Sequence, residues 1–158
     1  MQKLSLLLVP ALLLSSSVLA VAEEKKGTVT LELKNFFGLY RTGQPKPPAD
    51  ELCKKKFGDL AGPAKTTYDI NTTTNMMSAE TNFHGAAYQL KPLGIAGQYA
   101  FGHYQNPKEH NPPIYGVLFN ISLEFTNPRS SVILQLDEET NCLLTSSNKP
   151  LEADSMKQ

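Results

Sequence analysis

The sequence contains no tryptophan, only two cysteines and only three histidines among its 158 residues. Lysine and arginine balance aspartate and glutamate, 15 against 15, so the formal net charge is zero. Because proteins that bind nucleic acid concentrate basic charge, this balance predicts no nucleic-acid partner. The histidines, His84, His103 and His110, form no HxH or HExxH pattern. We therefore expect no metal site.

Linear motifs of catalysis are also missing. The sequence has neither a Gly-x-Ser-x-Gly nucleophile elbow nor a glycine-rich phosphate loop. Its carboxylates are scattered, except for Asp137-Glu138-Glu139, which we expect to cap an exposed turn between two strands. The sequence therefore predicts a binding protein that is not an enzyme, with no catalytic residues and no cofactor.

Long apolar runs are absent beyond the N-terminal segment. Lys3 precedes an apolar run over Leu4–Leu14, and Ala20-Val21-Ala22 offers the small residues that a signal peptidase requires. Residues 1–22 are thus predicted to be a signal peptide, with the mature chain beginning at Glu23; if retained, the segment would act as an anchor. No later run could span a bilayer, so no stable membrane span is expected. The predicted location is secreted: extracellular, or periplasmic in a bacterium.

The two cysteines, Cys53 and Cys142, lie far apart in the sequence. In an oxidising compartment they are predicted to form one disulfide, closing a loop of about 90 residues and contributing about 4 kcal/mol through loop-closure entropy. The alternative is two separate buried thiols. Metal ligands usually lie close together in pairs, and this pair lacks that spacing.

The sequence is rich in period-two alternation between turn formers, which is typical of strands. Thr28–Lys34 places Val29, Leu31 and Leu33 on one face, and Ile114–Phe125 alternates over its whole length. Shorter strands are predicted at Thr66–Ile70, Asn82–Leu90, Ile95–Tyr104, Ser131–Leu136 and Asn141–Thr145, with one possible short helix within Glu51–Leu60. Residues 23–158 are therefore predicted to form a single all-β domain, an antiparallel β-barrel or sandwich of about seven to eight strands.

Parts of the chain resemble the avidin and streptavidin family. Pro113–Ile121 is similar to the fifth strand of that family, Thr140–Ser147 to the seventh, Phe83–Tyr88 to the second and Ile95–Tyr99 to the third. Thr74–Met76 is similar to the end of its first loop. These segments follow the family order over roughly half of the chain. The resemblance implies a β-barrel that holds a small ligand and forms a homo-oligomer.

The resemblance also implies a ligand-binding set. Thr74, Tyr88 and Ser131 would keep polar contacts of the family's biotin site, and Phe119 would line the cavity. Tyr68, Ile121 and Cys142 would replace its tryptophans. Because the indole walls are lost, we expect a small apolar ligand rather than tight biotin binding. The predicted ligand-binding residues are Tyr68, Thr74, Tyr88, Phe119, Ile121 and Ser131.

A second interpretation is a secreted β-sandwich that acts through its surface, as an adhesin, effector or protein-binding module. The proline-containing loops Thr42–Asp50 and Gln105–Pro113 would then contact an extracellular protein partner, because loops on a rigid sheet often carry recognition. The two hypotheses differ in their structural expectations. A cavity between the sheets would favour the first hypothesis, and a packed interior would favour the second.

Overall fold

The computed structural model describes residues 24–96, 99–104, 114–122 and 124–150. The predicted signal peptide and the loop Gln105–Pro113 lie outside these ranges. The described chain is an all-β fold, as predicted, with one short α-helix. Its elements are β1 (Glu24–Leu33), β2 (Asn35–Tyr40), α1 (Asp50–Phe57), β3 (Gly62–Asn71), β4 (Met76–Phe83), β5 (Ala86–Ala96), β6 (Tyr99–Tyr104), β7 (Ile114–Ser122), β8 (Arg129–Gln135) and β9 (Thr140–Thr145), with short 3-10 turns at Pro47–Ala49 and Gly58–Leu60.

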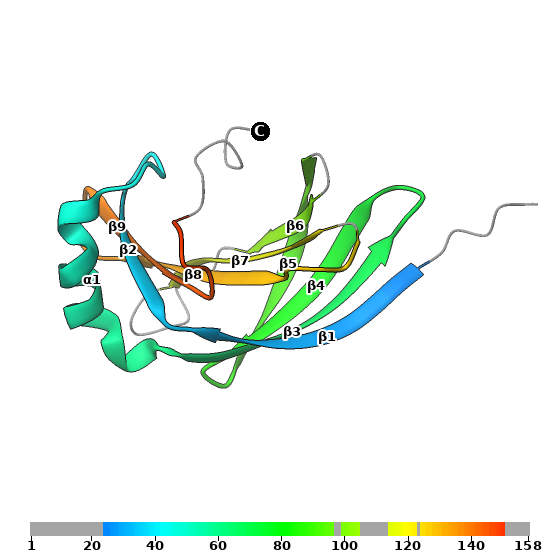
Figure 1. The fold of residues 1–158 in the computed structure, drawn as a ribbon, viewed down its shortest axis with the longest axis horizontal. Coiled ribbons are helices and arrows are strands. Elements are labelled where there is room, and N and C mark those ends of the chain that lie inside the picture. Colours follow the sequence, from blue (N-terminus) through cyan, green and yellow to red (C-terminus); the bar gives the residue numbers. More distant parts are fainter. Residues whose placement is uncertain (1–23, 97–98, 105–113, 123, 151–158) are drawn as a thin grey trace, which may run out of the picture.

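The strands form two antiparallel sheets that share β5. The complete order is β1-β3-β4-β5-β6-β7-β8-β9-β2, so β3 to β9 form a continuous meander. The consecutive strands β1 and β2 lie at opposite ends of this order, on either side of Lys34, whose backbone N–H donates to Thr145 O at 3.2 Å. The described strands do not close into a barrel. Figure 1 shows the resulting curved, open arrangement.

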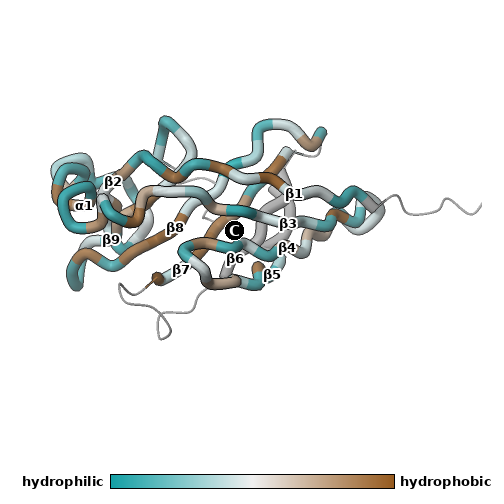
Figure 2. Tube along the Cα trace, turned by 90° about the horizontal axis from the view of Figure 1, so that it is seen from below, coloured by the Kyte–Doolittle hydropathy of each residue, from teal (hydrophilic) through white to brown (hydrophobic). Residues whose placement is uncertain are grey.

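The core lies between the two sheets, on their inner faces. Along β4, buried and more exposed residues alternate strictly, because one face packs inward and the other faces solvent. In contrast, β9 is buried at every position except Asn141. Figure 2 shows that the trace along the neighbouring strand β8 is also more hydrophobic than the traces along β3 and β4. The largest fully buried side chains of the core include Leu33, Ile70, Met77, Phe83, Tyr88, Phe119, Ile121, Val132, Leu134 and Leu144.

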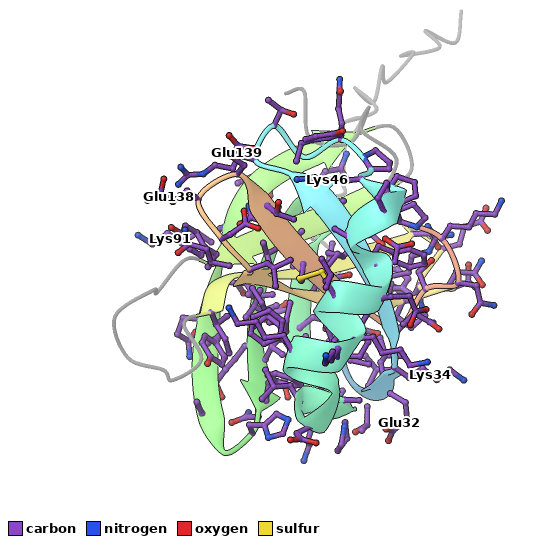
Figure 3. All side chains as sticks on the ribbon, turned by 90° about the vertical axis from the view of Figure 1, so that its left-hand side faces the viewer. Glu32, Lys34, Lys46, Lys91, Glu138 and Glu139 are labelled. Carbon is purple, nitrogen blue, oxygen red and sulfur yellow. A yellow bond between two sulfur atoms is a disulfide. The ribbon has the colours of Figure 1, made fainter. Side chains whose placement is uncertain are left out.

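The helix α1 covers one end of the fold and is cross-linked to the sheet. Cys53 of α1 forms a disulfide with Cys142 of β9, with 5.6 Å between their Cα atoms, and both side chains are fully buried. The predicted disulfide is therefore confirmed, and Figure 3 shows it behind the helix. A second link comes from Gly38 of β2, whose backbone N–H donates to the Asp50 carboxylate at 2.6 Å.

Gly38 is expected to be required for this packing. A Cβ atom at position 38 would lie 2.5 Å from both Ala49 Cβ and Lys46 O, far inside contact distance. The variant G38A should therefore lower the free energy of unfolding by about 1–3 kcal/mol, measured by urea denaturation. The matched control is G58A, because a Cβ there meets nothing within 4 Å and its φ of −54° suits alanine. Equal stability of both variants would contradict this packing.

Three strand predictions were wrong in detail. Ile95–Tyr104 is not one strand, because β5 ends at Ala96 and β6 begins at Tyr99. Asn82–Leu90 is not one strand, because a two-residue turn at His84-Gly85 divides it between β4 and β5. The strand predicted over Ile114–Phe125 ends at Ser122, and its pairing with β8 shifts between Ile114 and Gly116. This bulge places Ile114 opposite Leu134, on the inner face with Val117.

The acidic turn between β8 and β9 was predicted correctly. Asp137, Glu138 and Glu139 are exposed, and the Asp137 carboxylate accepts the backbone N–H of Glu139 at 2.9 Å. This hydrogen bond, the largest contribution, lowers the pKa of Asp137 below its usual value, because it favours the ionised form.

Candidate binding groove

Tyr68 and Phe119, from the predicted ligand set, meet between the sheets. Their rings stack with centroids 5.6 Å apart, joining β3 to β7. Gly27 of β1, the cross-strand neighbour of Tyr68, makes room for this arrangement, since a Cβ at position 27 would collide with the tyrosine hydroxyl. Phe119 is fully buried, whereas Tyr68 is half-buried. The pair therefore contributes to core packing.

Tyr88 and Ile121 also belong to the inner face, where each is 1% exposed. Tyr88 lies on β5 and Ile121 on β7, and both are members of the buried core cluster together with Phe119. Of the predicted ligand residues, Tyr68, Tyr88, Phe119 and Ile121 are thus placed in one cluster. Their side chains therefore contribute to the core between the sheets.

Thr74 and Ser131 lie elsewhere. Thr74 is exposed in the β3–β4 turn, where its backbone N–H donates to Asn71 Oδ1 at 3.0 Å. Ser131 is on the opposite face of β8 from Val132, and its hydroxyl donates to Thr145 Oγ1 at 2.7 Å. The preceding residue, Ser130, faces inward opposite Phe119, is fully buried, and its hydroxyl has no hydrogen-bond partner among the described residues.

The loop Thr42–Asp50, predicted to act in surface recognition, folds back on β2. Tyr40 N–H donates to Gln44 O at 2.8 Å, and Pro45 bridges to Leu39. Tyr40 itself is 47% exposed, with the Lys46 ammonium 5.2 Å from its ring centroid. The other predicted loop, Gln105–Pro113, lies outside the described residues.

The solvent-facing side of β1, β3 and β4 carries a groove of about 480 Å³. This volume lies within the range of small-molecule sites. We call it the binding groove, and its lining residues are Thr30, Pro63, Lys65, Asn82, His84 and Gly85. The strand register explains the convergence, because Thr30 pairs with Lys65 and Lys65 pairs with Asn82, in one row across the three strands.

His84 is held in position by the turn that contains it. The φ angles of His84 and Gly85 are 48° and 76°, and two positive values in a two-residue hairpin are those of a type I′ turn. The His84 Nε2–H donates to Leu60 O at 2.9 Å. The His84 and Phe83 rings pack edge to face, with 4.5 Å between their centroids. Because Nε2 is occupied, Nδ1 is the nitrogen left to contact a ligand.

Among the described residues that line the groove, Lys65 is the one that carries a full charge. The nearest acidic side chain on β4, Glu80, accepts hydrogen bonds from Gln89 Nε2 and, at 3.3 Å, from Asn82 Nδ2. Besides Lys65, the lining residues supply a hydroxyl, an amide, an imidazole and the apolar ring of Pro63. This chemistry suits a polar ligand that carries an acidic group.

Two further features, metal-binding clusters and membrane-spanning helices, have no candidate among the residues the structure covers. No group of three or more His, Cys, Asp or Glu side chains there could hold a metal ion. Across the same ranges, no helix is long and apolar enough to cross a membrane.

Comparison with protein-family models, with curated proteins and with solved structures finds no match in any of the three.

Proposed function

We propose that the protein is a secreted, non-catalytic binding protein that recognises a small hydroxyl-rich acidic ligand, such as a uronic-acid or sulfated sugar, in the binding groove. The observation that carries this proposal is the convergence of Thr30, Lys65, Asn82 and His84 on one groove of about 480 Å³. The residues of this groove are exposed to solvent, whereas Tyr88, Phe119 and Ile121 are buried in the core cluster.

The lining residues match such a ligand group by group. The Lys65 ammonium would pair with a carboxylate or sulfate, and a hydrogen bond to a charged group contributes about 1.5–3 kcal/mol. Thr30, Asn82 and His84 Nδ1 would bond to hydroxyl groups. The Pro63 ring offers the flat apolar surface on which the C–H face of a sugar can lie.

Two features support a secreted location for this activity. The N-terminal pattern of Lys3, an apolar run and Ala20-Val21-Ala22 is typical of a cleaved leader. The buried Cys53–Cys142 disulfide is of the kind that forms and persists in oxidising compartments.

The variant K65Q tests the proposal directly. For a sulfated uronic-acid disaccharide, K65Q should raise the dissociation constant at least about tenfold, which corresponds to about 1.4 kcal/mol, because the paired charge is lost. Binding is measured by isothermal titration calorimetry, with the uncharged, desulfated methyl ester as the control ligand. The matched control variant is K91Q, since Lys91 is an exposed lysine on β5 that does not line the groove. Equal loss in both variants, or no binding by the wild type, would contradict the proposal.

A second candidate function is an apolar ligand held between the sheets, as the resemblance to avidin implies. The observation in its favour is the fully buried Ser130 hydroxyl, which has no hydrogen-bond partner among the described residues and lies opposite Phe119. A ligand there would have to displace Tyr68, the half-buried member of the stack. Biotin is the natural probe of this alternative.

A further inference from the structure

The strand β1 leaves one long edge of the sheet available. Every ladder pair of β1 within the described ranges is made with β3, from Glu24–Asn71 to Leu33–Gly62, with no bulge. Figure 1 shows β1 along the border of the sheet. The strand contains no proline. A long, regular edge of this kind is a template for pairing with another strand.

The side chains of β1 that face solvent carry an ordered pattern of charge. They are Lys26, Thr28, Thr30 and Glu32, and Lys34 follows in the same phase. In Figure 3, Glu32 and Lys34 project from the same border of the fold, away from the body of the protein. Lys26 is 64% exposed even though its ammonium contacts Asp69 at 3.0 Å, so it can contact a second carboxylate.

We propose that two copies of the chain associate by antiparallel pairing of their β1 strands, centred on Val29. A two-fold axis normal to the sheet keeps the inner and outer faces of the two copies on the same sides. With this symmetry, one residue of β1 must lie opposite its own copy in the partner. With Val29 at the centre, Lys26 lies opposite the partner's Glu32, and Thr28 lies opposite the partner's Thr30. The two-fold axis repeats the pair of Lys26 with Glu32, so each charged pair on this face is complementary.

The neighbouring registers lack this complementarity. Centring the pairing on Thr28 would place Lys26 opposite the partner's Thr30. Centring it on Thr30 would place Glu32 opposite the partner's Thr28. Either shift loses the pair of Lys26 with Glu32, and opposite charges that face each other stabilise a strand pair, so charge favours the Val29 register over its neighbours.

Apolar burial favours the same association. Val29 and Leu31 point toward the core but are only half-buried, because they lie at the open border of the sheet. In the proposed register Val29 packs against the partner's Val29, and Leu31 faces the partner's Gly27. The dimer does not depend on the function of the binding groove, although Thr30 lies beside both.

Cysteine cross-linking tests which residues of the two β1 strands lie opposite each other. Opposed Cα atoms in antiparallel strands are about 4.5–5.5 Å apart, within the range of a disulfide. The variant V29C, expressed as the full chain through a secretory host, should form covalent dimers in most of the protein under mild oxidation. T28C should form none, because its two copies would be about 8 Å apart, whereas a mixture of T28C and T30C should cross-link. Efficient T28C cross-linking without V29C cross-linking would overturn the register.

Two measurements test the dimer without cysteine variants. They are the mass of the wild type in solution and the effect of exchanging the charges of Lys26 and Glu32. Light scattering of the wild type should show a concentration-dependent dimer. E32K should raise the dimer dissociation constant about tenfold, because Lys26 would then face a lysine, and K26E/E32K should restore it. A wild-type protein that stays monomeric at high concentration, or a double variant no tighter than E32K, would refute the pairing.

Discussion

The double variant C53A/C142A is expected to lose about 4–5 kcal/mol of unfolding free energy, because the unfolded chain regains the entropy of a long open loop. The disulfide joins residues 89 positions apart and is the covalent link between α1 and the sheet. Both sulfur atoms are in fully buried side chains, so the loss is not offset by solvation in the native state. Calorimetry should show a fall in melting temperature on the order of 15 °C.

Reduction provides the control for this experiment. Dithiothreitol should destabilise the wild type by a similar amount and leave C53A/C142A unchanged. A loss below about 1 kcal/mol in both tests would show that helix packing alone, without loop closure, holds this end of the fold.

The variant F119A is expected to lower the unfolding free energy by about 3–5 kcal/mol. Phe119 is fully buried and stacks on Tyr68, so the substitution removes apolar contact from both sheets and leaves a cavity. Urea denaturation measures the change. The control is F37A, at a half-buried phenylalanine of β2, which should lose distinctly less.

A double-mutant cycle separates stacking from burial. F119L and Y68L, alone and together, should give a coupling energy of about 0.5–1.5 kcal/mol if the two rings interact as a pair. Additive losses would mean that the rings only fill space. Because the binding groove lies on the other face of the sheet, F119A should retain the affinity for the acidic disaccharide.

The all-β fold was predictable because alternation of apolar and polar residues is a local signal, and the disulfide because the sequence has only two cysteines and a predicted secretory leader. Period-two alternation marked Val29, Leu31 and Leu33, all on the inner side of β1. The hairpin at His84-Gly85 was missed because the strong sequence signal for a type I′ turn is Asn-Gly or Asp-Gly, and here histidine takes the first position. The boundary between β1 and β2 could not be predicted from the sequence. The two strands are distinguished only by their partners, because β1 pairs with β3 and β2 pairs with β9.

The binding groove was not predictable, because it depends on non-local register. Thr30, Lys65 and Asn82 each occupy an ordinary solvent-facing position, and only the ladders of β3 with β1 and β4 align them. The residues of the interior were easier to predict. Tyr68, Phe119 and Ile121 each lie on the apolar face of the strand that contains them. The prediction for Ser131 was off by one residue. Ser130, and not Ser131, faces inward opposite Phe119.

Amide chemical-shift mapping is the measurement that tests the proposed function most directly. On titration with the sulfated uronic-acid disaccharide, the shifts should move at Thr30, Lys65, Asn82 and His84 and remain constant at Phe119 and Ile121. Biotin, titrated separately, should leave both groups unchanged. Shifts concentrated at Phe119, Ile121 and Ser130 with biotin, and none in the groove with the disaccharide, would contradict the surface site and establish the interior one.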